Sequence, residues 1–286
     1  MTVDNVSIPS AEQLVDVIGN SSVGIAVTDG TGAVVLHNKA QSVLMGGEAA
    51  HFTERILVGG ADGLAPLLAR LAAEQRIDNV EVAYRSTDGK QRAARVNAVR
   101  VEHGRTVRIH WVSRPELGER LPVSNTSDED ETTSDATAWI RAVDACEHPA
   151  LAPTADQQSV MREFFEVAPV AIHLIGVNGN VMHANPADIA LVEFDATPTD
   201  YVGNHIRQIY EDQGLVDDFL SRWDEDSPII NFRANFVTRE GAPKPVLIFS
   251  TAQAEGGNVS NTRCFVFSDP EPGRARDRVS AFGWPA

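Results

Sequence analysis

Two histidines beside a predicted turn are the first side chains to consider for chemistry. His173 and His183 flank the Asn178-Gly179 pair, and Asn-Gly between apolar runs is a strong signal for a tight β-hairpin. Across such a hairpin the two imidazoles could be diagonal neighbours, and two imidazoles can begin a metal site. The sequence supplies no third ligand beside them, and an ordinary surface or core position is the commoner role of a histidine. We therefore predict no metal site.

The motifs that usually mark an active site are absent from the sequence. It contains no G-x-S-x-G, P-loop, H-E-x-x-H or G-x-G-x-x-G pattern, and no phospho-acceptor motif of a histidine kinase. The two cysteines, Cys146 and Cys264, form no C-x-x-C pair, so neither a zinc ribbon nor a redox dithiol is indicated. We therefore expect a protein that is not an enzyme.

Length and charge limit the class of protein. With 286 residues, of which 43% are hydrophobic, the chain is long enough for two domains that each bury a core. The net charge of −16 disfavours direct binding to nucleic acid or to an anionic membrane, because phosphates repel an acidic surface. No apolar run approaches the roughly 20 residues that span a bilayer, and Met1–Asn5 does not resemble a signal peptide. These features predict a cytoplasmic protein with reduced thiols.

An internal repeat sets the domain organisation. The segment Val23–Ala40 aligns without a gap with Val170–Ala187, at an offset of 147 residues. The repeated positions include a turn glycine and an asparagine in each copy: Gly32, Asn38, Gly179 and Asn185. A repeat of this length indicates two copies of one domain. We place the first domain at residues 10–115 and the second at 154–269.

Each copy contains the same predicted order of elements. Ser10–Gln13 and Thr154–Gln157 are capping boxes that open short amphipathic helices. A hairpin follows, then helical segments that include Leu64–Gln75 and Val216–Trp223, then three strands. This order predicts an antiparallel α+β domain, with a five-stranded sheet and helices on one side of it. The apolar stripes of the first helices show burial but not the partner, so each could cover its own domain or pair between protomers.

An acidic linker is predicted between the two copies. Residues 116–153 contain nine acidic side chains against two arginines, and Ser124–Asp135 has no apolar residue. Such a segment cannot bury enough apolar surface to offset its ordering entropy, so we expect a disordered spacer. A docking segment for a basic partner is the alternative interpretation. Trp139, Ile140 and Val143 indicate a short helical island within the linker, and residues 270–286 are expected to be a disordered tail.

The repeated elements and their motifs resemble the PAS domain family. The hairpin of the second copy is similar to the family pattern D-x-x-G-x-(I/V)-x-x-x-N-x-A. The matching segments are Thr28–Ala40 and Ser86–Lys90 in the first copy, and Val167–Ile172, Val177–Ala187, Tyr201–Ile206 and Thr262–Val266 in the second. The resemblance implies that Asn38 and Asn185 cap the helix that leaves the hairpin, a structural role, and that Gly32 and Gly179 form its turn.

The sequence departs from the family at two places. Val177-Asn178 stands where an Asp commonly precedes the glycine of the hairpin. After the last strand, Pro270 and Pro272 stand where a D-x-T motif usually opens a helix that leads to an effector domain. Two prolines so close together cannot begin a continuous helix in that register.

The resemblance to the PAS family also suggests which residues could bind a cofactor. Haem-binding members of the family use a helix histidine, and His205 lies near the start of the corresponding helix. His173 and Trp223 are further candidates for lining a cofactor pocket. Light-sensing members carry a cysteine in a sequence context that neither Cys146 nor Cys264 matches. We predict no bound cofactor, with haem or flavin as the alternative.

These observations predict a tandem-PAS signal-transduction protein that is not an enzyme. We expect it to act by protein–protein contact or dimerisation, through its sheet faces and N-terminal helices, in a bacterial regulatory or two-component pathway. Its expected partner is a second copy, a sensor kinase or a response regulator. A sensor of a small ligand or cofactor is one alternative function. A degenerate sensor histidine kinase that lacks its catalytic half is another.

Overall fold

The computed structural model describes residues 8–47, 51–52, 55–58, 61–86, 89, 91–117, 135–146, 154–193, 201–221, 229–255 and 258–269. Its helices in chain order are α1 (Ala11–Gly19), α2 (Lys39–Met45), α3 (Leu64–Glu74), α4 (Asp135–Asp144), α5 (Ala155–Val167), α6 (Pro186–Val192), the 3₁₀ helix η3 (Ile206–Ile209) and α7 (Gln213–Ser221). Both capping boxes form as predicted, so α1 and α5 begin directly after Ser10 and Thr154. The predicted tail 270–286 and most of the acidic stretch 124–135 lie outside the described residues.

The first half of the chain forms a seven-stranded antiparallel sheet with the strand order β2-β1-β7-β6-β5-β3-β4. Its strands are β1 (Gly24–Asp29), β2 (Val34–His37), β3 (Ile56–Val58), β4 (Ala61–Asp62), β5 (Arg76–Arg85), β6 (Gln91–His103) and β7 (Thr106–Pro115). Five of these are the predicted strands. The additional β3 and β4 extend the sheet beyond β5, and strands of three and two residues are too short for an alternating pattern to be recognised.

The second half forms a five-stranded antiparallel sheet with the order β10-β11-β12-β8-β9. Its strands are β8 (Ala171–Gly176), β9 (Val181–Ala184), β10 (Ile229–Val237), β11 (Pro243–Glu255) and β12 (Asn258–Ser268). The order matches the five common strands of the first sheet, position for position. Even the irregularity in the hairpin is repeated, since the register shifts between Val27 and Thr28 in one half and between Leu174 and Ile175 in the other.

Both faces of each sheet are covered. The strands β1 and β8 are buried along almost their whole length, so side chains that alternate between the faces are buried on either side. On the inner faces lie α2 and α3 in the first half, and α6, η3 and α7 in the second. The prediction of helices on one side of each sheet is therefore incomplete, because α1 and α5 cover the opposite, outer faces.

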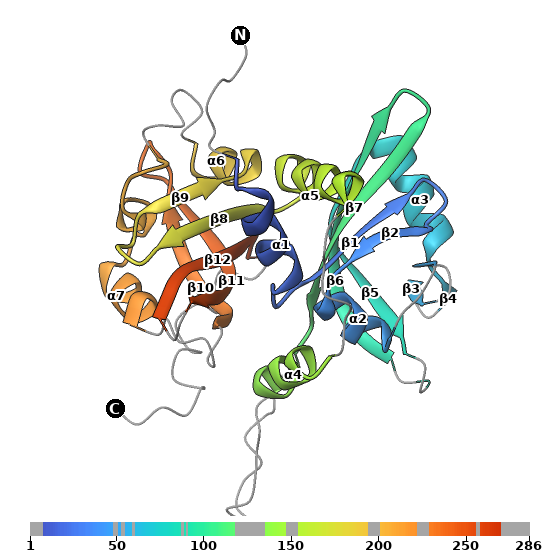
Figure 1. Ribbon diagram of the computed structural model, residues 1–286, viewed down its shortest axis with the longest axis horizontal. Helices are drawn as coiled ribbons and strands as arrows, with labels where there is room; N and C mark the ends of the chain where they lie inside the picture. The colour runs from blue at the N-terminus through green and yellow to red at the C-terminus, as the bar shows by residue number, and fades with distance from the viewer. Residues whose placement is uncertain are drawn as a thin grey trace, which may run out of the picture.

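The outer faces of the two halves share one apolar cluster, which we name the junction cluster (Figure 1). Its buried side chains come from α1, α5 and both sheets: Leu14, Val17, Ile18, Val23, Ile25, Val27, Leu36, Val112, Val160, Met161, Phe164, Phe165, Ala168, Val170, Ile172, Leu174, Ile230, Leu247, Phe249, Phe265 and Phe267. The helices α1 and α5 pack against each other within it. The sequence left open whether each helix covers its own domain or pairs with a helix of a second protomer. In the structure, α1 and α5 pair with each other within one chain.

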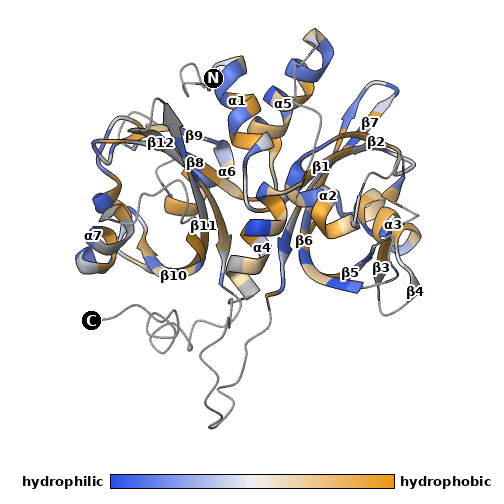
Figure 2. Cartoon of the chain, turned by 60° about the horizontal axis from the view of Figure 1, so that its bottom comes forward, coloured by the Kyte–Doolittle hydropathy of each residue, from blue (hydrophilic) through white to orange (hydrophobic). Residues whose placement is uncertain are grey.

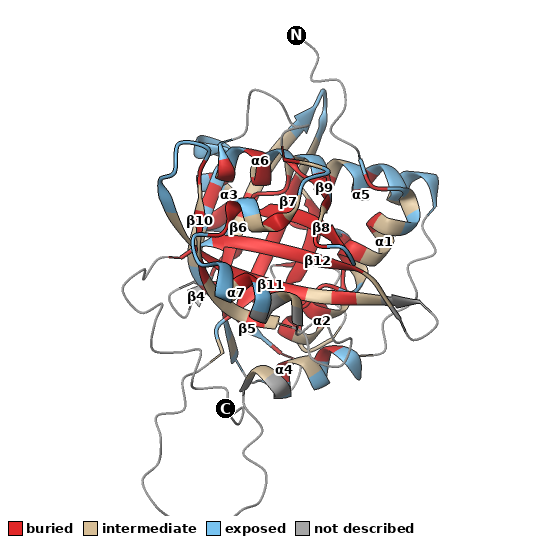
Figure 3. Ribbon diagram, turned by 90° about the vertical axis from the view of Figure 1, so that its left-hand side faces the viewer, coloured by how far each residue is buried: buried red, intermediate tan, exposed pale blue. Residues whose placement is uncertain are grey.

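Further views locate this junction in the molecule. Figure 2 shows α1 and α5 together at one end of the space between the halves and α4 at the other end. In Figure 3 the strands β8, β11 and β12 run buried through the middle of the second half. The sheet faces that the sequence assigned to contacts between protomers are thus packed against each other inside one chain.

Candidate functional site

A buried group of polar side chains lies on the inner face of the second sheet. Nδ1 of His173 lies 3.0 Å from Oδ1 of Asp188. The hydroxyl of Tyr201 donates a hydrogen bond to Oδ2 of the same carboxylate at 2.8 Å. All three residues are completely buried, and their neighbours are the apolar side chains of the inner core. We name His173, Asp188 and Tyr201 the buried triad.

Local structure explains how the triad is assembled. Because side chains alternate along β8, His173 points to the inner face between Ile172 and Leu174, which belong to the junction cluster. Asp188 is the third residue of α6, and its backbone N–H donates to Oδ1 of Asn185, the N-cap, at 2.9 Å. The asparagine cap therefore fixes the first turn that presents the Asp188 carboxylate to the imidazole.

Further groups with polar atoms border the triad. Cys264 lies directly opposite His173 in the ladder between β8 and β12. Its thiol donates to Oγ of Ser250 at 3.4 Å, and both residues are buried. The ring of Tyr210 packs against that of Phe236, with 4.9 Å between the centroids.

The charge state of the triad follows from its surroundings. Burial lowers the pKa of His173, but Asp188 and Cys264 more than compensate and raise it to about 10. Burial and the nearby Asp188 raise the pKa of Tyr201 well above 10, so its hydroxyl stays protonated and donates. At neutral pH the inner core of the second half therefore holds an imidazolium–carboxylate pair. Such a pair is costly to desolvate and is not required for packing.

The first half has the same backbone positions but no charged pair. The sheet registers and the repeat place Ala26, Gln41 and Trp111 where the second half has His173, Asp188 and Cys264. Nε1 of Trp111 donates to the hydroxyl of Thr28 at 3.0 Å, and its ring packs 5.3 Å from that of Phe52. These are neutral contacts around a large apolar side chain, so the fold itself does not need the triad.

The candidates from the sequence do not converge on one site. Leu174 pairs with His183, so His183 lies on the outer side of the sheet while His173 faces the inner core. The two histidines are therefore not diagonal neighbours, because the register puts the two rings on opposite faces. Among the described residues, no group of three or more His, Cys, Asp or Glu could hold a metal ion.

His205 has a structural environment. Its Nδ1 accepts a hydrogen bond from the backbone N–H of Arg207 at 3.2 Å and so caps η3. Its ring lies over Gly179, where the Cβ atom of any larger residue would stand only 2.4 Å from Nε2. The ring therefore covers the hairpin turn rather than the inner core. Trp223 lies outside the described residues.

The repeated asparagines brace the hairpins from inside. Oδ1 of Asn38 accepts from the N–H groups of Ile25 and Gln41, both at 2.9 Å, and Oδ1 of Asn185 accepts from Ile172 and Asp188 at the same distance. The amide nitrogen of Asn38 donates to the carbonyls of Ile18 and Val23 and to Oγ of Ser21. That of Asn185 donates to the carbonyl of Val170 at 3.0 Å. Both asparagines thus join a helix start to a sheet and to the chain that enters it.

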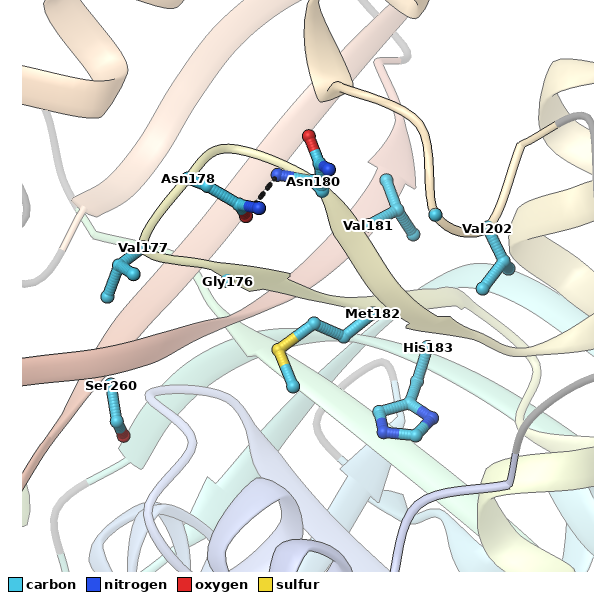
Figure 4. Close-up of a pocket in the computed structure, with 10 residues that line it drawn as sticks. Gly176, Val177, Asn178, Asn180, Val181, Met182, His183, Val202 and Ser260 are labelled. Carbon is cyan, nitrogen blue, oxygen red and sulfur yellow. Dashed lines mark hydrogen bonds between the residues drawn. The ribbon is translucent and has the colours of Figure 1, made fainter.

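The turn glycines have conformations that other residues rarely adopt. Gly32 has φ +92° and Gly179 has φ +77°. Beside the second turn, a shallow surface groove of about 600 Å³ is lined by the hairpin, Val202 and Ser260 (Figure 4). Val177 and Met182 expose 65% and 38% of their surface there. This groove is separate from the triad, which has no exposed atom to offer it.

Charged contacts cross the junction in both directions, from a helix of each half to a strand of the other half. Glu163 of α5 contacts β7 of the first half, through Arg108 at 2.5 Å and Nε2 of His110 at 2.8 Å. Asp16 of α1 forms an ion pair with Arg263 on β12 of the second half. His110 and Arg263 occupy the same position of the two copies, since they pair with Val27 and Leu174. Each N-terminal helix therefore reaches the last strand of the opposite half.

Electrostatics at this contact follow from burial. Burial lowers the pKa of His110, and the neighbouring Glu163 offsets only part of that effect. Burial acts to raise the pKa of Glu163, but its hydrogen bonds from His110 and Arg108 outweigh it and lower the pKa. At neutral pH a neutral His110 therefore donates to a Glu163 carboxylate.

One pair of equivalent positions meets across the junction. Arg114 on β7 and Phe267 on β12 are matched by the registers of the two sheets. The guanidinium carbon of Arg114 lies 5.7 Å from the centre of the Phe267 ring, a cation–π contact. Direct contact between matched positions shows that the halves are related by an approximate two-fold axis at this point.

Side chains fill the described part of the inner core of the second half. The described side chains between the helices and the sheet are buried and in contact, among them Tyr201, Ile206, Tyr210 and Phe236. A planar ring system would have to displace several of them. His205, the candidate iron ligand, is turned to Gly179 instead.

Comparisons with known proteins found matches among solved structures. No family model and no curated protein matches the chain. A PAS domain of an HTR-like protein from Haloarcula marismortui is 18% identical, with a TM-score of 0.35 over 40% of this chain and 93% of that one. A PAS domain from a two-component sensor histidine kinase is 15% identical, with a TM-score of 0.32 over 37% and 91%. An RNA-binding light-oxygen-voltage receptor is 12% identical, with a TM-score of 0.36 over 86% and 95%.

Both halves of the chain have a PAS-like fold. The assignment rests on the shared order of five strands and on the sequence of elements, helix, two strands, helices and three strands, to which the first half adds β3 and β4. Among the described residues, no helix is long and apolar enough to cross a membrane.

Sequence reasoning missed Asp188 and Tyr201. Asp188 stands at the third position of a helix, where an acidic residue is ordinarily explained by the helix dipole. A usable signal existed, since the same position in the first copy is the neutral Gln41 and the strand position of His173 is Ala26. The two positions at which a neutral residue of the first copy is replaced by an ionisable residue of the second are therefore visible in the aligned repeat.

Proposed function

We propose that the chain is a tandem-PAS signal-transduction protein whose second half receives the signal and whose first half serves as its packing partner. The observation that carries the proposal is the buried triad of the second copy, since Ala26 and Gln41 stand in the first copy at the positions of His173 and Asp188. A buried ion pair commonly marks a functional position, because a well-packed apolar core would be at least as stable.

The geometry supports a route from the triad to the junction. His173 alternates along β8 with Ile172 and Leu174, and Cys264 follows Arg263 on β12. Those neighbours contact the junction cluster or Asp16 of α1. A change in the protonation or packing of the triad therefore shifts strands whose other face holds the two halves together.

The proposed output is protein–protein contact without catalysis. The chain would act in a bacterial regulatory or two-component pathway, in the cytoplasm, with a sensor kinase, a response regulator or a second copy as partner. Because the outer sheet faces and the apolar faces of α1 and α5 are buried in the junction, the partner surface would lie elsewhere or be released when the junction opens.

Partner capture with matched variants tests the proposal. The full chain, its Asp188→Asn variant and its Gln41→Ala variant are used as baits in lysate of the producing organism. Far-UV circular dichroism confirms that each bait is folded. We expect Asp188→Asn to change the recovery of at least one partner about fivefold or more, and Gln41→Ala to leave it unchanged. Equal recovery with all three baits would contradict a signal-receiving second half.

A sensor of a small ligand is the second candidate function, favoured by the same triad. The polar atoms of His173, Asp188 and Tyr201 could be redirected to a ligand if η3 and α7 moved away from the sheet. An absorption spectrum of the purified chain tests the cofactor form of this function. A haem or flavin band would support it, and a colourless protein would count against it.

A further inference from the structure

The helix α4 belongs to neither PAS-like half, yet it is docked on the first one. It lies within the predicted linker, and its buried side chains are Trp139 and Val143, each 6% exposed. Nε1 of Trp139 donates to the carbonyl of Ser22 at 2.9 Å. α4 also packs against α2. We name the surface formed by Ser22 and α2 the α4 seat.

The contacts of α4 are those of an amphipathic helix that packs through one face. Ala136, Trp139, Ile140 and Val143 follow the i, i+3, i+4, i+7 spacing of one helix face. Trp139 and Val143 belong to the inner core of the first half, and Ala136 and Ile140 pack against the junction cluster. On the opposite face, Ala138, Arg141 and Asp144 are exposed. The seat therefore lies where the first core and the junction meet.

α4 depends on the seat for its structure. It has 10 residues, fewer than the roughly 12–15 at which an isolated helix becomes marginally stable in water. Its helical form and its docking are therefore formed together, and leaving the seat costs both. The chain between β7 and α4 includes residues 118–134, which when extended reach roughly 55 Å. On this side the chain is long enough to follow α4 off the seat, whereas on the other side the shorter segment 147–153 ties α4 to α5.

We propose that the α4 seat is a reversible binding site for an amphipathic helix, occupied in this structure by α4 and open to a partner helix of the same chemistry. The partner helix would carry a tryptophan and a β-branched residue four positions later. The tryptophan supplies a large apolar ring and one N–H, which match the pocket and the carbonyl of Ser22. α4 is held by its tether at a high effective concentration, so a partner must compete with it.

The seat is also placed to affect the rest of the molecule. Ser21, next to Ser22, accepts a hydrogen bond from the amide of Asn38 and donates to the carbonyl of Val23. This short segment connects α1, which is in the junction, to β1, which is in the sheet. Exchange of α4 for a partner helix therefore acts on the connection between the junction and the first sheet.

Peptide binding to the full chain tests this site. The probe is a fluorescein-labelled peptide with the sequence of residues 133–147 and serine in place of Cys146. Its binding is measured by fluorescence anisotropy to the wild-type chain, to a Trp139→Ala/Val143→Ala chain, and to an Arg141→Ala chain as the exposed-face control. We expect the double variant, whose own helix no longer occupies the seat, to bind the peptide at least tenfold more tightly than the other two. A peptide that itself carries Trp139→Ala should lose at least tenfold in affinity.

Three outcomes would overturn the proposal: no binding to any chain, equal binding to all three, or equal affinity for both peptides. The wild-type chain gives an independent answer if the double variant does not fold. With excess peptide, the backbone amides of residues 139–145 should exchange with solvent faster as α4 is displaced. An unchanged exchange rate at millimolar peptide would refute reversible docking.

Discussion

The two halves of this chain share a fold and differ in what fills it. Both have the same five-strand order, the same hairpin irregularity and an asparagine in the same bracing position. On the inner face the first half places Trp111 against Phe52, whereas the second places His173 against Asp188. The difference shows which features the fold demands, since those recur, and which belong to one half alone.

The asymmetry also separates two kinds of buried polar group. Asn38 and Asn185 satisfy backbone groups of the helix and strand that they join, so their burial is a condition of the fold. The triad satisfies only its own side chains. A second half with an apolar core at those positions should fold as the first one does, and this difference is the basis of the signalling role proposed above for the triad.

Removal of the triad carboxylate should produce the largest difference between the halves. Asp188→Ala leaves the His173 imidazolium buried without its counter-ion, and breaking such a pair costs about 3–5 kcal/mol. Gln41→Ala at the matched position of the first half removes a neutral amide and should cost about 1 kcal/mol. Urea unfolding followed by circular dichroism gives both free energies of unfolding. Equal losses would show that the two cores are energetically alike.

Raising the pH should weaken the second half selectively. The pKa of His173 is raised in the folded chain to about 10, above its unfolded value near 6.5, so its stabilisation is fully present below about pH 6.5. This contribution to the free energy of unfolding is lost as the pH rises through 10. Between pH 7 and pH 9 the loss is roughly 2 kcal/mol. Hydrogen exchange of β8 and β12 amides, corrected for the intrinsic rate at each pH, measures the loss.

The first half provides the control for this pH effect. Ala26 stands at the position of His173, so corrected exchange in β1 and β7 should change less than in β8 and β12. A His173→Phe chain should lose the pH dependence of the second half. Persistence of the dependence in that variant would place its origin in another group.

Replacing the asparagines Asn38 and Asn185 should change the free energy of unfolding by amounts that differ less than those of the preceding comparisons. The side chain of Asn38 makes five hydrogen bonds, and that of Asn185 makes three. Asn38→Ala should therefore cost about 1–3 kcal/mol more than Asn185→Ala, at a net value near 0.5–1.5 kcal/mol for each of the two additional bonds. Thermal and urea unfolding of the two single variants measure the difference. A larger loss for Asn185→Ala would indicate that positioning Asp188 outweighs the number of bonds.

The two ionic contacts that cross the junction, Asp16–Arg263 and Glu163–Arg108, should differ least in their contribution to the free energy of unfolding. Asp16→Asn removes the partner of Arg263, whose side chain is 4% exposed and always charged, and should cost about 1–2 kcal/mol. Glu163→Gln leaves a His110 that is already neutral and an Arg108 that is 26% exposed, so its cost should be about 1 kcal/mol or less. The free energy of unfolding at pH 7 ranks the two variants. The reverse order would show that His110 is charged in the folded chain.

Local signals in the sequence are sufficient to predict much of the fold. The capping boxes at Ser10 and Thr154 and the hairpin turns at Gly32 and Gly179 involve residues close in sequence, and a repeat reinforces each of them. The strands β3 and β4 escape prediction because they are too short to show a period. The junction could not be predicted, because an apolar outer face looks the same in sequence whether it meets a helix, a protomer or a second half of its own chain.

The candidate site shows the same limit. The sequence marks His173 as a chemically capable residue, but the hairpin pattern suggests His183, ten residues away, as its neighbour. The sheet register pairs His173 with Ala184 and Leu174 with His183, and Asp188 of α6 lies beside His173 instead. Because a step of one residue exchanges the two faces of a strand, spacing along the chain does not by itself show which side chains are neighbours.

The contact between Arg114 and Phe267 has a consequence for how the halves choose each other. Near a two-fold axis, a complex of two identical first halves would bring two guanidinium groups together, and like charges repel. A complex of two second halves would lack the cation. Because one covalent chain carries both versions of the position, each is complementary to the other and not to itself. At this position the contact therefore favours the pairing of unlike halves over the pairing of two copies of the same half.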